Sequence, residues 1–180
     1  MRKVVKKLFF AWDFDKEEKW LNEMAAKGMG LVAIGFCRYE FEDCEPGEYK
    51  YKLELLEHGR NHPETQKYIA FLEETGVDHL GFFSKWCYFR KKAADGEFDI
   101  FSDFESKIKH LKRIQMLMLP IGIMGLAIGI QNICLFFSQH FAGNIIIGAV
   151  DVLLSLLLGF GVYKVEKKKK KLKKECQIFE

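Results

Sequence analysis

Two long apolar stretches in the second half of the chain dominate its hydrophobic pattern. They cover residues 114–137 and 145–163, and a membrane-spanning helix needs about 20 such residues. The strongly polar or charged positions inside them are Gln115, Gln131, Asn132 and Asp151. The pattern predicts two transmembrane helices joined by an external loop at residues 138–144.

Small residues recur at spacings of three and four along both predicted membrane helices. In the first helix one face carries Gly122, Gly125, Gly129 and Asn132. In the second helix one face carries Gly148, Asp151, Ser155 and Gly159. In an antiparallel pair this spacing sets Gly125 opposite Gly159 and Gly129 opposite Ser155, which lets the two backbones approach closely. We expect Asn132 and Asp151 to hydrogen-bond. Three roles are open for Asp151. It could lock the helix pair through its hydrogen bond with Asn132, contact a partner's transmembrane helix, or belong to an ion or proton pathway.

The distribution of charge predicts an orientation. Residues 1–100 contain 16 basic and 19 acidic side chains, whereas residues 101–180 contain 12 basic and 6 acidic ones. Basic residues flank both apolar stretches and are missing from the loop at 138–144, so the positive-inside rule places both termini in the cytoplasm. We therefore expect a multi-pass protein of the plasma membrane, with a basic tail, 164–180, against anionic lipid. The acidic first part argues against nucleic-acid binding.

A helix should lead into the first membrane stretch. Ser102 and Glu105 have the spacing of a capping box, which predicts a juxtamembrane helix over 101–113. Pro120 should kink the helix that follows, because proline removes one backbone hydrogen bond.

Residues 1–100 show the periodicities of a cytoplasmic α+β domain. Strands are predicted at 4–12, 37–42, 49–55 and 77–91, and helices at 15–27 and 64–74, each helix closed by a glycine. The order is β-α-β-β-α-β, which is the ferredoxin-like arrangement. The two middle strands form the clearest predicted hairpin, since their pairing sets Arg38, Glu40 and Glu42 against Glu54, Lys52 and Lys50.

A weak internal repeat supports a duplicated unit. At an offset of 48 residues, Gly28 aligns with Gly76, Val32 with Leu80, and Phe41 with Phe89.

No motif for catalysis, a cofactor or a metal rises above background. His58 and His62 have a zinc-like spacing, but Gly59 and Pro63 interrupt the helix that would align them. The acidic pair Glu17–Glu18 is typical of an exposed face, and Cys37 and Cys87 fall on predicted strands. The five cysteines form no C-x-x-C and are expected to be reduced cytosolic thiols. The apolar run at 8–12 is too short for a signal peptide.

Aromatic residues are more numerous than one small core needs. Five of them are candidates for an apolar ligand pocket or for an interface between sheets: Trp12, Phe82, Phe83, Trp86 and Tyr88. RNA binding through such rings would need a motif that this chain lacks.

Several of these segments resemble a bacterial family catalogued as domain of unknown function 2812. The similar stretches are 8–12, 17–25, 39–42, 46–51, 86–91 and 100–107. The resemblance implies a domain that precedes transmembrane helices. It also implies a role in a regulated membrane or stress response, because members lie beside PadR-like regulators, and it assigns no catalytic residues.

The sequence favours a membrane-tethered, non-enzymatic sensory or protein-interaction module. Its expected partners are membrane lipid and a membrane protein or a second copy of the chain, with no nucleic acid and no cofactor. Two alternatives remain. One is an enzyme acting on a lipid or apolar compound, which predicts a pocket holding Cys37, His79 or a perturbed acid. The other is a small subunit of a transporter.

Overall fold

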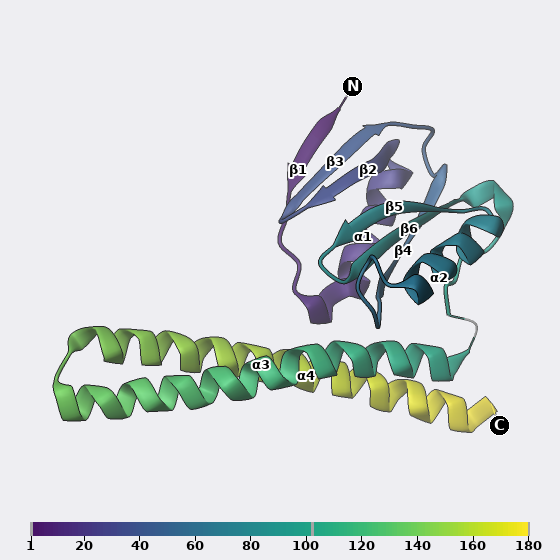
Figure 1. Ribbon diagram of the computed structural model, residues 1–180. Coiled ribbons are helices and arrows are strands. Elements are labelled where there is room, and N and C mark those ends of the chain that lie inside the picture. Colours follow the sequence, from purple (N-terminus) through teal and green to yellow (C-terminus); the bar gives the residue numbers. More distant parts are fainter. Residues whose placement is uncertain (1, 102, 180) are drawn as a thin grey trace. The chain divides into compact units, whose positions relative to one another are not determined.

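The chain forms two compact units, Met1–Ser106 and Lys107–Glu180. The computed structural model describes residues 2–101 and 103–179, with side chains described up to residue 176. The first unit is mixed α/β, and the second consists of two long helices (Figure 1).

The first unit contains two three-stranded antiparallel sheets. The first sheet has the order β1 (Lys3–Lys6), β3 (Arg38–Asp43), β2 (Met29–Gly35). The second has the order β4 (Tyr49–Leu55), β6 (Trp86–Lys92), β5 (Val77–Phe83). β2 and β5 also lie close to each other, so the two sheets are neighbours within one unit.

Two helices pack against these sheets. α1 (Phe14–Ala26) contacts β2 and β4, and α2 (Pro63–Glu74) packs on β5. Short 3-10 helices lie at Ala11–Asp13 and Ala93–Asp95. Each half of the unit therefore reads β-α-β-β, and the single βαββαβ sheet predicted from the sequence is wrong in its order and pairing.

The predicted hairpin between residues 37–42 and 49–55 is not formed. β3 instead pairs with β2 across a turn at Phe36–Cys37, while β4 pairs with β6. The segment expected as one bent strand at 77–91 is a hairpin, β5–β6, with its turn at Ser84–Lys85.

The 48-residue repeat recurs in the structure. Gly28 and Gly76 have φ angles of 77° and 81° after their helices, a left-handed conformation that glycine adopts without strain. Strand β2 is irregular between Leu31 and Ala33, and β5 is irregular between His79 and Gly81, again 48 residues apart. The repeat thus covers a helix and the hairpin after it.

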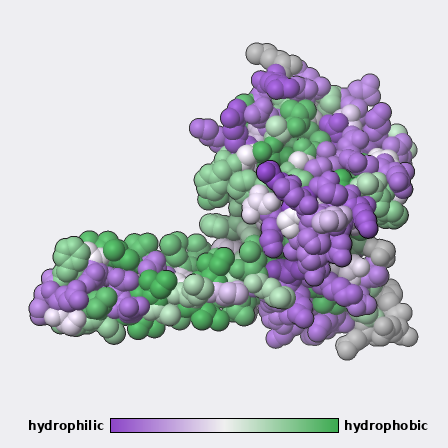
Figure 2. Space-filling view, in the orientation of Figure 1, coloured by the Kyte–Doolittle hydropathy of each residue, from purple (hydrophilic) through white to green (hydrophobic). Residues whose placement is uncertain are grey.

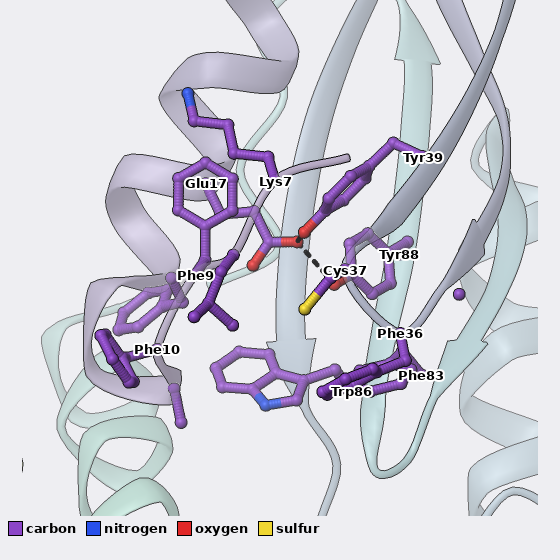
Figure 3. Close-up of a pocket in the computed structure, with 14 residues that line it drawn as sticks. Lys7, Phe9, Phe10, Glu17, Phe36, Cys37, Tyr39, Phe83, Trp86 and Tyr88 are labelled. Atoms are coloured by element: carbon purple, nitrogen blue, oxygen red, sulfur yellow. Dashed lines mark hydrogen bonds between the residues drawn. The ribbon is translucent and has the colours of Figure 1, made fainter. Parts of the chain in front are cut away.

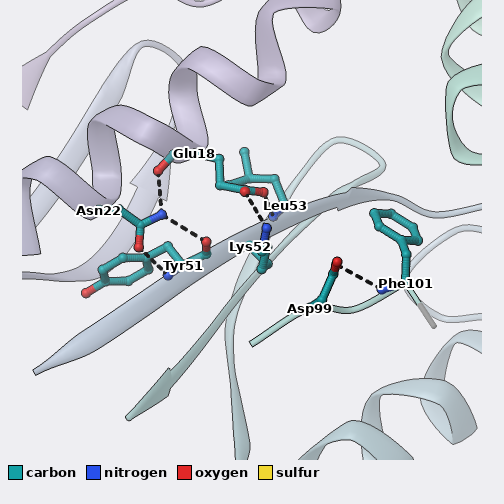
Figure 4. Close-up of polar contacts among 7 residues, drawn as sticks. All are labelled: Glu18, Asn22, Tyr51, Lys52, Leu53, Asp99 and Phe101. Atoms are coloured by element: carbon teal, nitrogen blue, oxygen red, sulfur yellow. Dashed lines mark hydrogen bonds and ion pairs between the residues drawn. The ribbon is translucent and has the colours of Figure 1, made fainter. Parts of the chain in front are cut away.

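Helix α1 covers the open edge of β4. The Asn22 side chain donates to the Tyr51 carbonyl at 3.1 Å and accepts from the Tyr51 N–H at 2.9 Å, as a neighbouring strand would (Figure 4). Glu18 accepts from the Leu53 N–H at 3.3 Å and from Lys52 Nζ at 2.8 Å. These side chains satisfy backbone groups that an edge strand leaves open.

The described residues of the unit form two hydrophobic cores. The larger one joins α1 to both sheets; its buried residues are Leu21, Met24, Ala25, Leu31, Tyr39, Phe41, Tyr51, Leu53 and Tyr88. The second lies under α2; its buried residues are Leu56, Ile69, Leu72, Val77, Cys87 and Phe89.

The second unit is built from α3 (Phe104–Gln139) and α4 (Ala142–Phe179). Both helices are long and apolar enough to cross a membrane, and Figure 2 shows a broad hydrophobic surface along them. Helix α3 runs continuously through Pro120, and α4 continues through the lysine-rich segment predicted as a tail. Asp103 accepts from the Ser106 N–H at the start of α3, whereas Ser102, the predicted cap, lies outside the described residues.

Candidate functional site

A buried carboxyl group is the most unusual polar feature of the first unit. Glu17 lies on α1 with 7% of its surface exposed. It precedes Leu21, Met24 and Ala25 by four, seven and eight positions, so it lies on the helix face that packs into the larger core. The prediction that Glu17 is part of an exposed acidic face is therefore wrong.

Two tyrosine hydroxyls hold this carboxyl group. Tyr39 on β3 donates to Glu17 Oε1 at 2.7 Å, and Tyr88 on β6 donates to the same oxygen at 2.6 Å (Figure 3). One donor comes from each sheet, so the carboxylate ties α1 to both. Burial raises the pKa of Glu17, and the two tyrosine hydrogen bonds oppose that rise. Burial and the nearby Glu17 carboxylate also raise the pKa values of Tyr39 and Tyr88.

Glu17 faces a cavity of about 140 Å³. Most of its walls are aromatic or aliphatic; the lining residues are Lys7, Leu8, Phe9, Phe10, Ala11, Phe14, Glu17, Gly35, Phe36, Cys37, Tyr39, Phe83, Trp86 and Tyr88. The walls come from the segment before α1, from α1 itself and from the turns of both hairpins (Figure 3). The repeat therefore brings its two hairpins together around one small space.

The hairpin turns shape the rim of the cavity. Cys37 has a φ of 51° and Ser84 a φ of 58°, so each two-residue turn contains a left-handed residue that is not glycine. Phe36 is 77% exposed, and its ring centroid lies 6.0 Å from that of Phe83 on the second hairpin. The rim thus presents an aromatic pair to solvent.

Lys7 brings a positive charge to the outer side of the cavity. Its Nζ lies 4.9 Å from the ring centroid of Phe9 and 4.5 Å from that of Trp20, within the range of a cation–π contact. In the described part of the chain, Lys7 forms no ion pair with Glu17.

The structure places three of the five predicted aromatics in this cavity: Phe83, Trp86 and Tyr88. Trp12 is buried elsewhere and stacks on Phe10 with ring centroids 4.6 Å apart. Phe82 packs beside the second core, 4.6 Å from the ring of His79. Of the groups tied to the enzyme alternative, Cys37 and a perturbed acid line the cavity, and His79 does not.

His79 is a half-buried histidine beside the second core. Its Nε2 has no hydrogen-bond partner among the described residues, and burial lowers its pKa. The ring packs against Phe82 and Phe89, with centroid distances of 4.6 Å and 5.8 Å.

A possible metal-binding cluster lies at the start of α2. Ligand atoms of His58, His62 and Glu64 lie within 4.8 Å of one another, although the sequence did not favour such a site. His62 caps α2 by accepting the Glu64 N–H at its Nδ1, and His58 Nε2 lies 3.0 Å from Glu64 Oε2. Each of these contacts uses one ring nitrogen of its imidazole and leaves the other ring nitrogen as the potential ligand atom.

The two long helices pack in a register different from the predicted one. A Cβ added at Gly125 would lie 2.7 Å from Ser155 Oγ, and one at Gly148 would lie 2.8 Å from the Gly129 carbonyl oxygen. Gly159 has no such neighbour within 4 Å, so the predicted contact between Gly125 and Gly159 is wrong.

The polar side chains in the middle of the two helices bond within their own helix. Asn132 donates to the Ile128 carbonyl at 3.0 Å, and Ser155 donates to the Asp151 carbonyl at 2.8 Å, each within its own helix. The predicted hydrogen bond between the side chains of Asn132 and Asp151, both of which are described, is not formed. Between the helices, Gln115 donates to Glu166 at 2.8 Å and accepts from Lys169 at 2.9 Å.

The fold and the cavity define a two-unit chain: a mixed α/β unit with a small aromatic cavity, and two helices that could cross a membrane. Residues 13–123 match the family described as Protein of unknown function (DUF2812). The match covers more than half of the 180 residues, so the chain belongs to this family. Comparisons with curated proteins and with solved structures give no match.

Proposed function

We propose that this chain is a membrane-tethered sensory module whose α/β unit binds a small molecule in the cytoplasm. The observation that carries the proposal is the aromatic cavity with the buried Glu17 carboxyl in its wall. Small-molecule sites are typically concave and apolar, with a few placed polar groups that orient the ligand. A ligand that contacts both hairpin turns would change how the two sheets are held together, and this change would be the signal to a partner.

The tether in this proposal is the helix pair of the second unit. Two apolar helices joined by a short connection fit a membrane hairpin, and lysines gather at the ends of the apolar stretches that lie away from the connection. The partner would be a membrane protein or a second copy of the chain.

The test is a ligand screen on the full-length protein in mild detergent. All three tryptophans, Trp12, Trp20 and Trp86, lie in the first unit, so their fluorescence reports on its unfolding. We expect small aromatic or aliphatic compounds to raise its melting temperature. Ala11→Phe, which fills the cavity, should abolish the rise, and Ala70→Phe on the exposed face of α2 should preserve it. An equal response from both variants would refute the site.

A second function, acid–base chemistry on a small apolar compound, is favoured by one observation. Glu17 combines a raised pKa with a place in a cavity wall, which is a common property of catalytic acids. In that case a compound that binds would also be converted, and Glu17→Gln would stop conversion while leaving binding in place.

A further inference from the structure

The cavity contains a buried acid that lacks a charged partner. Both hydrogen bonds to Glu17 end on Oε1, and both come from neutral phenols. Among the described residues, no Lys, Arg or His forms an ion pair with this carboxyl group. Burying a charge without an opposite charge is costly, so a cation beside the carboxylate, or a proton on it, would stabilise Glu17 in this wall.

The second carboxyl oxygen is the atom that such a partner would meet. Oε2 has no hydrogen bond, yet it is not among the fully enclosed unpaired side-chain atoms of the described chain. Since Glu17 lines the cavity, Oε2 is the part of the carboxyl group left for a donor inside it.

The surrounding rings suit a positive charge as well as an apolar group. Aromatic faces attract ammonium groups, and one ring of the lining, Phe9, already has the ammonium group of Lys7 4.9 Å from its centroid. Phe14 and Trp86 stack with centroids 5.7 Å apart beside the same space and add two further ring surfaces.

We propose that the cavity binds a small organic amine as its ammonium ion. The ammonium group donates to Glu17 Oε2, and its apolar part lies among the rings of Phe14, Phe83 and Trp86. A volume of about 140 Å³ suits a single ring or a short alkyl chain, because sites for drug-sized ligands are about 300–1,000 Å³. This inference rests on the proposed function and names the ligand class of that site.

The test compares three probes of similar size on the full-length protein in detergent: 2-phenylethylamine, the neutral propylbenzene and the anionic 3-phenylpropanoate. We expect the amine to bind about tenfold or more tightly than the neutral compound, and the anion to bind least. Glu17→Gln should reduce the affinity for the amine about tenfold and leave that for propylbenzene unchanged. Glu23→Gln, which removes an exposed charge from the same helix, should leave the affinity for all three probes unchanged.

The outcomes separate this inference from the proposed function. If propylbenzene binds as tightly as the amine and Ala11→Phe abolishes both, the site exists but the ammonium assignment is overturned. If none of the three probes binds, the ammonium assignment is overturned, while the proposed function is decided by the ligand screen with Ala11→Phe and Ala70→Phe. Should Glu17→Gln not fold, the ranking of the three probes on the wild-type protein still decides the question.

Discussion

At the scale of single residues, Glu17 owes its properties to its position on α1. A carboxyl group on the buried face of a helix loses hydration, and the hydroxyls of Tyr39 and Tyr88 replace only part of it. A signal for this burial is present in the sequence, because residue 17 shares a helix face with Leu21, Met24 and Ala25. Adjacency to Glu18 suggested an exposed pair, yet Glu18 turns toward β4 and Glu17 toward the cavity.

The raised pKa of Glu17 predicts how stability depends on pH. The folded state holds the proton more tightly than the unfolded chain, so this contribution is complete below the unfolded pKa of 4.5 and is lost as pH rises through the folded value. Glu17→Gln removes this pH-dependent contribution. The melting temperature of the variant minus that of the wild type should therefore increase as the pH rises from 4 to 8. Melting followed by tryptophan fluorescence measures this difference.

The pH dependence expected for Glu17 must be separated from that of the titratable groups around it. Tyr39 from β3 and Tyr88 from β6 have raised pKa values and stay protonated throughout, while Lys7 and Cys37 line the same cavity. Burial also raises the pKa of Glu18 beside Lys52, so the melting temperatures of the wild type and of Glu17→Gln both depend on pH through Glu18. The test of Glu17 is therefore the difference between the two melting temperatures. A difference that stays constant from pH 4 to 8 would contradict the assignment.

At the scale of elements, strand identity was easier to predict than strand pairing. Residues 49–55 form a strand as expected, and the strand expected at 37–42 runs over 38–43, with Cys37 in the turn. Charge complementarity chose the wrong partners, because exposed cross-strand ion pairs contribute only about 0.2–1 kcal/mol. The turns that do form hairpins, at Phe36–Cys37 and Ser84–Lys85, lack the Asn-Gly type of signal, whereas Pro46–Gly47 joins strands of different sheets. Strand β2 was missed because its short apolar run contains no alternation.

Because the strand pairing was predicted wrongly, the sequence did not predict the cavity. Phe83, Trp86 and Tyr88 were recognised as surplus aromatics, but the cavity exists only because the β2–β3 and β5–β6 turns meet. That meeting depends on long-range packing, which neither periodicity nor spacing encodes.

The contact between α1 and β4 predicts a large effect for one side chain. Asn22→Ala leaves the N–H and C=O of Tyr51 without their partners at the strand edge, so the free energy of unfolding should fall by about 2 kcal/mol. Denaturant unfolding followed by tryptophan fluorescence measures the loss. The neighbouring Glu23→Ala, at an exposed position, should change stability by less than about 0.5 kcal/mol. Similar losses in the two variants would show that α1 does not protect the β4 edge.

The register of α3 against α4 can be tested by crosslinking. A Cβ at Gly122 would lie 3.5 Å from Leu158 Cβ, which is within the range for a disulfide. In a background without the five native cysteines, Gly122→Cys with Leu158→Cys should form an intramolecular disulfide in the membrane. The pair Gly125→Cys with Gly159→Cys should not, because Gly159 has no neighbour in position. Efficient crosslinking of the second pair alone would restore the register first expected from the small-residue spacing.

At the scale of the whole molecule, charge and hydrophobicity divide the chain in the same place. The mildly acidic first part carries the cavity, and the basic second part carries the two apolar helices. In the proposed arrangement the helices tether the α/β unit to the membrane, and an amine that partitions between water and lipid is concentrated there.

The proposed orientation predicts which positions water-soluble reagents can reach. In a cysteine-free background, Ser138→Cys near the connection between the helices should react with a membrane-impermeant thiol reagent in intact cells. Lys173→Cys should react only after the cells are permeabilised, because the positive-inside rule keeps the lysine-rich end of α4 in the cytoplasm. Labelling of Lys173→Cys in intact cells would place that end outside. It would then place the cavity outside as well, because two spanning helices return the chain to the side from which it entered, and the amine would have to be an extracellular one.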